Sequence, residues 1–356
     1  MIHRRPDYYT KFRCLGVACP DTCCRDWSVV PDGEALADYA SAPSPLRERI
    51  AQNLVTDEDG DVCFRLDGRG MCALLTPNGL CAIQRDWGEA HLCAHCAAYP
   101  RFTEEFGCLT ESSLAISCPE AARLLRSAPR FALMETDDGN PDPPFDGVDR
   151  SLLAELEHSR AQVLALLGGD GGLWAKLRAI LIYAEALQDC IDAGKCGKMA
   201  ACPLTSALPE DATQRQPSAV RLLGMLAGLE PLLPSWPKLL KKRAKQLSAL
   251  SPAEYATLCA DYARANPDCE RQLTNLACYF VFRHWHKAVN DDDIYGRAAF
   301  VCAAVSALYH LSLFQPGEEA VLWTRFSREV EHDEDNLSEL IWALSEPDTL
   351  PPPLSY

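Results

Sequence analysis

The cysteines constrain what this chain can fold into more than any other feature of its sequence. The chain has 18 cysteines among 356 residues, and 11 of them fall within the first 118 residues. Residues 1–6 contain no apolar signal-peptide core, so we expect a cytoplasmic protein. In that reducing compartment cysteines rarely form structural disulfides. The polar, turn-rich first third therefore indicates bound metal, because metal ligation can replace a missing apolar core.

The thiols of the first third are arranged in short motifs. Along the chain they are Cys14-x4-Cys19-x3-Cys23-Cys24, Cys72-x8-Cys81, Cys93-x2-Cys96 and Cys118, with Cys63 and Cys108 between them. Thiolate is a soft ligand that selects zinc, copper(I) or an iron–sulfur cluster. Zinc fingers usually contain two compact Cys-x2-Cys pairs, whereas this region has one, and adjacent cysteines such as Cys23 and Cys24 seldom both reach one zinc. We therefore favour an iron–sulfur cluster of the 4Fe-4S type, with zinc and metal-free thiols as alternatives.

The charge balance excludes several classes of partner. Lys and Arg number 34 against 50 Asp and Glu, which gives a formal net charge of −16. Such a chain lacks the positive surface that would bind nucleic acids or anionic membranes, so neither is an expected partner. No membrane span is expected either, because the most apolar stretch, 298–314, is interrupted by His310. A basic partner, such as a lysine-bearing protein surface, fits the sign of the charge.

We predict a mainly α fold in two domains. Residues 1–135 are expected to form a cysteine-rich metal-binding domain with short helices and few short strands, followed by a linker at 136–150 and an α-helical domain at 151–356. In the first domain the sequence predicts helices at 34–39, 45–54 and 120–125, and short strands at 62–66 and 81–84. Residues 136–149 hold two Gly, three Pro and five Asp, which favour a loop over a helix or strand.

The second half has the periodicity of amphipathic helices. Apolar residues recur at spacings of three and four, which places them on one helical face. The predicted helices span 152–167, 173–191, 273–287, 295–313 and 336–344. A further helix begins after Ser251, because Ser251 and Glu254 form a capping box around Pro252 at the first helical position.

Several of these motifs resemble those of the flagellin lysine N-methylases. The matching segments are Phe12-x-Cys14-x4-Cys19-Pro-Asp21-Thr-Cys23-Cys24-x2-Trp27, Met71-Cys72-x8-Cys81-x-Ile-Gln84, Leu92-x3-Cys96-x2-Tyr99-Pro100-Arg101 and Leu114-x3-Cys118-Pro119-Glu120. Their order and spacing fit the family over about 110 residues. In the second half, the segment Asn275-x3-Tyr279-Phe280-x2-Arg283-His284 resembles the family less sharply. The cysteine motifs also resemble, more loosely, the clustered-cysteine domains that chelate iron or zinc.

This resemblance implies methyl transfer from S-adenosylmethionine to the ε-amine of lysines on flagellin, dependent on an iron–sulfur cluster. Carried over by position, the metal ligands would be Cys14, Cys19, Cys23, Cys24, Cys72, Cys81, Cys96 and Cys118. Cys93 has no fixed counterpart in the family, and Cys63 and Cys108 are additional. Eight thiols could hold two four-iron clusters, or one cluster with supporting thiols. A non-catalytic zinc- or iron-binding module and a redox or electron-transfer iron–sulfur protein are the alternatives.

Methyl transfer to lysine requires an uncharged amine held in line with a methyl sulfonium. Aromatic side chains can hold both cations by cation–π contact, and Trp27, Trp87 and Tyr99 lie near the cysteine motifs. Arg101 could bind the carboxylate of the cofactor. The candidate catalytic residues are thus Tyr99, Arg101 and Trp27, and the candidate cofactor-binding residues are Arg101, Trp27 and, in the helical half, Arg283. Aromatic packing and surface ion pairs are the ordinary explanations for the same residues.

Two further groups of residues have a possible role. His91 and His95 lie beside the Cys93–Cys96 motif and could act as bases or ligands, although a solvated or packed histidine is more common. Cys190, Cys196 and Cys202 recur at intervals of six residues. Ordinary helix and loop thiols explain that spacing without any further function.

Overall fold

The computed structural model describes residues 1–139, 147–205 and 212–345. The chain is mainly helical, with 59% helix and 10% strand, as the sequence predicted. It divides into two compact units. We call residues 11–102 and 114–122 the small unit, and residues 1–10, 103–113 and 123–356 the helical unit. The two units interleave along the chain, whereas the sequence predicted consecutive segments.

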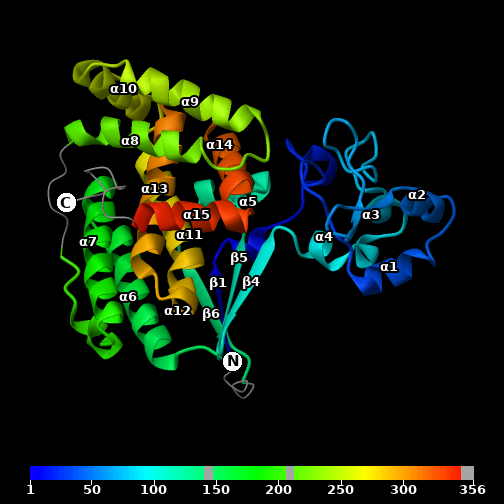
Figure 1. Cartoon of the computed structure of the whole chain (residues 1–356), viewed down its shortest axis with the longest axis horizontal. Coiled ribbons are helices and arrows are strands. Elements are labelled where there is room, and N and C mark those ends of the chain that lie inside the picture. The colour runs from blue at the N-terminus through cyan, green and yellow to red at the C-terminus, as the bar shows by residue number, and fades with distance from the viewer. Residues whose placement is uncertain (140–146, 206–211, 346–356) are drawn as a thin grey trace. The chain divides into compact units, whose positions relative to one another are not determined.

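A four-stranded sheet has the strand order β4-β5-β1-β6, and most of its residues belong to the helical unit (Figure 1). Its strands are β1 Ile2–Pro6, β4 Arg101–Phe106, β5 Leu109–Leu114 and β6 Leu133–Asp137. β1 pairs with β5 in parallel and with β6 in antiparallel orientation.

One sequence prediction is wrong in this sheet. Thr136 and Asp137 were expected in the linker, but they pair with His3 and Ile2 as the end of β6. Sequence periodicity missed this strand because four of its five side chains are exposed and its pairing is made by the backbone. Residues 140–146 of the predicted linker lie outside the described residues.

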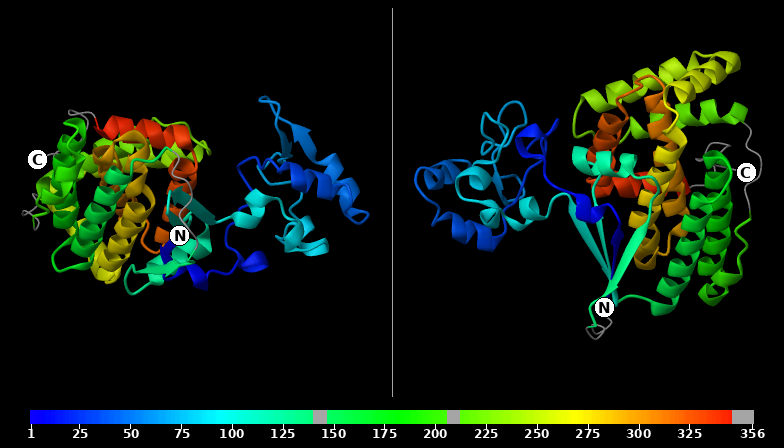
Figure 2. Two further views of the ribbon diagram at one scale, coloured as in Figure 1. Left: turned by 90° about the horizontal axis from the view of Figure 1, so that it is seen from below. Right: turned by 180° about the vertical axis from the view of Figure 1, so that it is seen from behind.

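Long helices form most of the helical unit and confirm the predicted periodic segments (Figures 1 and 2). The α-helices from residue 119 onward, long and short, are α5 Pro119–Ser127, α6 Arg150–Gly168, α7 Leu173–Asp192, α8 Ala212–Leu226, α9 Ser235–Ser248, α10 Pro252–Ala265, α11 Cys269–His284, α12 Ala288–Asp291, α13 Ile294–Ser312, α14 Glu319–Phe326 and α15 Glu334–Ser345. The predicted capping box opens α10: the Ser251 hydroxyl accepts from the Glu254 N–H, and the Glu254 carboxylate accepts from the Ser251 N–H at 2.8 Å.

Helix α13 lies at the centre of this unit. It packs against α7, α8, α11, α14 and α15, and nearly every side chain along it is buried. It is also the one helix among the described residues that is long and apolar enough to cross a membrane, with a mean hydropathy of 1.3. Because 94% of that stretch is buried inside the protein, its apolar character matches that of a core helix.

The small unit is built from short elements. They are α1 Gly33–Tyr39, α2 Leu46–Gln52, β2 Leu54–Thr56, β3 Val62–Phe64, α3 Ala82–Asp86 and α4 Ala94–Ala98. Its apolar core is made by residues such as Tyr39, Ile50, Phe64, Leu74 and Ile83, and Cys72, Cys81 and Cys96 pack against that core.

The strand predicted at 81–84 is wrong. Cys81 makes a single bridge to Leu75, and helix α3 begins at the next residue. This helical turn buries Ala82 and Ile83 together in the small core, which an extended strand with alternating faces would not do.

Candidate metal centre

Five thiols of the small unit lie near one another, and we call them the inner thiol group. They are Cys24, Cys72, Cys81, Cys93 and Cys96. Cys24 is an electrostatic neighbour of Cys72, Cys81 and Cys96, and Cys93 hydrogen-bonds to Cys96. All 18 cysteines, each within the described residues, are free thiols. Residues that are up to 72 positions apart in the sequence therefore contribute to one site.

Local structure explains how these thiols are positioned. Cys93 precedes α4 and Cys96 lies one turn into it, so both thiols occupy one side of that helix. Asp32 fixes the start of this helix, since its carboxylate accepts from the Ala94 N–H at 2.7 Å and from the Ala35 N–H at 2.9 Å. The Ala94 and Ala35 N–H groups lower the pKa of Asp32. A backbone hydrogen bond of 2.9 Å from the Cys72 N–H to the Cys24 carbonyl joins two further segments.

Three other thiols of the small unit form a second thiol group: Cys14, Cys19 and Cys118. Cys118 is an electrostatic neighbour of both Cys14 and Cys19. The Cys19 thiol donates to the Asp21 carbonyl at 2.6 Å, and Cys14 is exposed. Cys23 is exposed and hydrogen-bonds to the Cys24 thiol, so the adjacent pair extends from the inner thiol group toward solvent.

The surroundings of the inner thiol group disfavour negative charge on most of its thiols. Burial raises the pKa of Cys72 to about 11 and also raises that of Cys81, with the neighbouring thiols adding to the effect. Within the Cys93–Cys96 pair, the hydrogen bond from Cys96 lowers the pKa of Cys93 to about 6, while the same bond raises that of Cys96. Adding a second or third negative charge is therefore unfavourable unless a positive centre accompanies it.

The donor set can be compared with the two expected metals. In the part of the chain that the structure describes, no three or more His, Cys, Asp or Glu side chains close around a single ion. Four sulfurs at about 2.3 Å from one zinc would lie only about 3.8 Å apart. The thiolates of a four-iron cluster bind different iron atoms and lie farther apart. A single zinc ion and a four-iron cluster thus require different sulfur spacings, and the soft thiol donors of the inner thiol group suit either metal.

Cys93 was not among the sequence-predicted ligands, although the structure places it in the inner thiol group. The compact Cys-x2-Cys spacing with Cys96 is the signal that could have found it. Cys63 is buried in β3, opposite Val55. Cys108 follows Gly107 in the turn between β4 and β5 of the helical unit.

The structure brings two of the predicted aromatic residues together. Trp27 and Tyr99 make an edge-to-face contact with ring centroids 5.8 Å apart. The Trp27 indole donates to the Cys23 carbonyl at 2.9 Å, which places this pair beside the cysteine motif. Arg101 instead stacks over the Phe12 ring at 5.1 Å.

The predicted histidines have ordinary surroundings. Trp87 stacks on the His91 ring at 3.7 Å, and the His91 Nδ1 is 2.7 Å from an Asp38 carboxylate oxygen. His95 is exposed on α4. Arg283 belongs to the helical unit, where it is buried with its Nε 3.7 Å from Glu331 Oε1. Its charge therefore has a structural partner within its own unit.

A cavity of about 790 Å³ in the small unit adjoins both thiol groups, because Cys19 and Cys72 both line it. Its charged lining residues are Arg25, Arg69, Asp21 and Asp67. Its volume is within the usual range for small-molecule sites, about 300–1,000 Å³. These residues offer cations for a carboxylate and carboxylates for an amine.

A strained backbone segment orients Arg25 in this cavity. The Arg25 Nε donates to Asp26 at 2.6 Å, and its Nη1 donates to Asp21 at 3.3 Å. Asp26 has a φ of 69°, which is uncommon for any residue except glycine. Its N–H donates to the Gly70 carbonyl at 2.8 Å, and a Cβ at position 70 would lie 2.7 Å from the Asp26 carboxylate. Glycine is therefore required at position 70 for this arrangement.

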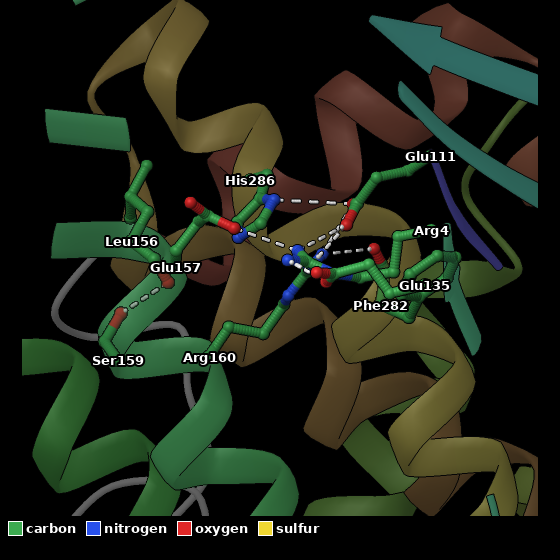
Figure 3. A network of polar contacts seen from close by, with 9 residues as sticks. All are labelled: Arg4, Glu111, Glu135, Leu156, Glu157, Ser159, Arg160, Phe282 and His286. Carbon is green, nitrogen blue, oxygen red and sulfur yellow. Dashed lines mark hydrogen bonds and ion pairs between the residues drawn. The ribbon is translucent and has the colours of Figure 1, made fainter. Parts of the chain in front are cut away.

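The helical unit contains a separate buried polar network (Figure 3). At its centre, Glu111 of β5 receives two hydrogen bonds from the Arg160 guanidinium of α6, one of them at 2.6 Å. Arg4 of β1 reaches the same carboxylate at 3.2 Å, and His286 Nδ1 lies 3.4 Å from it. Although burial alone would raise it, the hydrogen bonds and charge of Arg160, together with the hydrogen bond from His286, hold the pKa of Glu111 well below its usual range. The network ties the sheet to α6 and lines part of a cavity of about 820 Å³.

Acidification is expected to destabilise the helical unit between about pH 6.5 and pH 4. Burial lowers the pKa values of His284, His286 and His310 to about 4 each. Their unfolded values are about 6.5, so only the unfolded chain takes up these protons in that interval. The contribution to stability is complete above about pH 6.5 and is lost as the pH falls. Between pH 7 and pH 5 we expect a loss of about 2 kcal/mol per histidine, measured by urea denaturation.

His310 provides the test of this assignment, since it faces Tyr255 at 2.9 Å, the Ser306 carbonyl at 2.7 Å and the Arg215 cation. The His310→Gln variant should show a smaller pH dependence than the parent, by about 2 kcal/mol over the same interval. Equal pH dependence in the two proteins would contradict the assignment.

Comparison with known proteins finds relatives among the lysine-N-methylases. Lysine-N-methylases of Salmonella typhimurium (strain LT2) and Salmonella choleraesuis are each 28% identical over 203 residues, which cover 53% of this chain and 49% of each of those proteins. No family model and no solved structure matches the chain. The chain spans about half the length of the curated lysine-N-methylases it matches.

A further match is more specific to the flagellum. The flagellar biosynthetic protein FliU of Salmonella muenchen is 28% identical over 137 residues, which cover 36% of this chain and 80% of that protein. The comparisons confirm the resemblance to the flagellin lysine N-methylase family.

Proposed function

We propose that this chain is an iron–sulfur-dependent protein methyltransferase that moves a methyl group from S-adenosylmethionine to the ε-amine of lysines on flagellin in the cytoplasm. Similarity to proteins named Lysine-N-methylase supports the reaction, and similarity to FliU supports a flagellar acceptor. The observation that carries the proposal is that cysteines from three of the four family motifs lie near one another in the inner thiol group.

The cluster would be held by Cys24, Cys72, Cys81 and Cys96. Cys93 would support them from the core, because it is only 1% exposed and hydrogen-bonds to Cys96. When bound, the cluster supplies a positive centre for the thiolates and a cross-link between the segments that carry them. The thiols Cys72 and Cys81 already pack on the small apolar core, so the cluster would lie against it.

The cavity beside Cys19 and Cys72 would bind the methyl donor. Arg25 and Arg69 carry the positive charges that a carboxylate requires, and Asp21 and Asp67 complement an α-amine. Arg25 is better placed for this role than Arg101, because Asp26 orients Arg25 at the cavity, whereas Arg101 stacks on Phe12. We therefore assign the contact with the cofactor carboxylate to Arg25, whereas the sequence favoured Arg101.

The acceptor amine would approach the Trp27–Tyr99 pair. Aromatic rings of this kind stabilise an ammonium or a sulfonium by cation–π attraction. In the transfer, the lysine first loses a proton to solvent, and the amine lone pair then forms the nitrogen–methyl bond as the sulfur–methyl bond breaks. The products are methyl-lysine and S-adenosylhomocysteine.

The experiment that tests the proposal combines binding and turnover. The protein is purified without oxygen, and its binding of S-adenosylhomocysteine is measured by titration. It is then incubated with flagellin and S-adenosylmethionine, and the mass of the flagellin is measured by mass spectrometry. We expect methyl masses on flagellin that are absent without the donor and absent after iron is chelated. Iron and sulfide in the protein without any methylation would contradict the proposal and favour a redox function.

A further inference from the structure

Two thiols of the helical unit are not among the residues of the proposed site. Helix α7 ends at Asp192, and Gly194, with a φ of 63°, reverses the chain. The short 3-10 helix Cys196–Ala201 then brings Cys202 back along α7. The Sγ atoms of Cys190 and Cys202 are 3.7 Å apart, in van der Waals contact.

The position of Cys202 is fixed by its neighbours. Its Sγ lies 3.5 Å from the Ala186 carbonyl, one helical turn before Cys190. The reversal itself is held by hydrogen bonds of 2.8 Å from Lys195 N–H to the Cys190 carbonyl and from Gly194 N–H to the Ile191 carbonyl. Both thiols are partly exposed, so a small reagent can reach them. A disulfide needs the sulfurs to approach to about 2.05 Å, a movement of under about 2 Å.

Acidic residues near the Cys190–Cys202 pair favour a neutral oxidant over an anionic one. Asp189 and Glu155 lie near Cys202, and Asp149 and Asp292 lie near Cys196. Burial, and then the hydrogen bond with Cys190, raises the pKa of Cys202 to about 11. Carboxylates repel anionic oxidants such as glutathione disulfide. A small neutral oxidant has no such barrier.

We propose that Cys190 and Cys202 are a site of oxidative modification, at which a peroxide converts the two thiols into an intramolecular disulfide. One thiolate attacks a peroxide oxygen, the O–O bond breaks, and a sulfenic acid and water form. The second thiol displaces the sulfenic oxygen as a second water and closes the S–S bond. Two sulfur atoms are oxidised and the two peroxide oxygens are reduced. The bond ties the 3-10 helix covalently to α7, and both of these elements pack against α6.

Tryptic digestion can identify which cysteines form the disulfide. Trypsin cuts after Arg178, Lys195, Lys198 and Arg215, so peptides 179–195, 196–198 and 199–215 each carry one of the three cysteines. The native protein, containing whatever metal it binds, is treated with hydrogen peroxide. Free thiols are then alkylated in denaturant, and the protein is digested without reduction.

We expect a linked species of peptides 179–195 and 199–215, about 2 Da lighter than the sum of the two thiol peptides and separated by reduction. The Cys202→Ser variant should lose it, while Cys196→Ser, the matched control, should retain it. Alkylation of both Cys190 and Cys202 after oxidation of the folded parent would overturn the proposal. So would loss of the linked species in the Cys196→Ser variant.

Discussion

Replacing Cys96 by Ser is expected to abolish cluster binding and to lower flagellin methylation by more than about 100-fold. A loss of that size exceeds the loss expected when a residue that only supports a metal ligand is removed. Cys96 hydrogen-bonds to Cys93 and is an electrostatic neighbour of Cys24 and Cys81. A serine hydroxyl is a harder and far weaker ligand for iron than a thiolate. The measurements are iron content and visible absorbance after anaerobic purification, followed by the methylation assay.

Two control variants distinguish the loss of a metal ligand from the loss of the folded structure. Cys63→Ala removes a buried thiol of β3 in the same unit, and Cys93→Ala removes the thiol assigned to support. Both should retain visible absorbance, with Cys93→Ala losing at most about 100-fold in activity. An iron content in Cys96→Ser equal to that in Cys63→Ala would show that Cys96 is not a ligand.

The Arg160→Met substitution is expected to destabilise the helical unit by about 3–5 kcal/mol. Arg160 and Glu111 are 3% and 4% exposed, and both oxygens of the Glu111 carboxylate receive hydrogen bonds from Arg160. Removing the guanidinium leaves a buried carboxylate with the longer contacts to Arg4 and His286 alone. Urea denaturation at pH 7 measures the effect.

An exposed ion pair provides the control for this prediction. Arg264 lies 3.0 Å from Asp261, and their side chains are 76% and 57% exposed. Arg264→Met should cost less than about 1 kcal/mol, since water already solvates both charges. The double variant Glu111→Leu with Arg160→Met should recover much of the loss, because no charge is then left unpaired. A cost for Arg160→Met no larger than that for Arg264→Met would refute the assignment.

The predictable part of the fold is the part encoded by neighbouring residues. The apolar spacing of 173–191 and the Ser251–Glu254 capping box identify α7 and the start of α10, because both depend on contacts within a few residues. The end of β6 could not be found this way, since Thr136 and Asp137 are ordered by backbone pairing with residues more than 130 positions earlier. Cys81 and α3 show the same limit, because burial of Ile83 in the core decides the local conformation.

The candidate site was predictable in composition and only partly in arrangement. The family motifs give the cysteine residues, but they cannot show that Cys14, Cys19 and Cys118 gather separately from the inner thiol group. Arg25 follows Cys24 directly, yet its place in the cavity depends on the left-handed Asp26 and its contact with Gly70. The Arg160–Glu111 pair joins residues 49 positions apart and has no local signature.

Anaerobic analysis of iron and acid-labile sulfide tests the central claim most directly, because it asks what the inner thiol group holds. With four thiolates on one four-iron cluster, the purified chain should contain about four iron and four sulfide per molecule, and the Cys96→Ser variant should contain neither. One zinc per molecule without sulfide, or thiols that all react with alkylating reagent in the folded protein, would contradict the account.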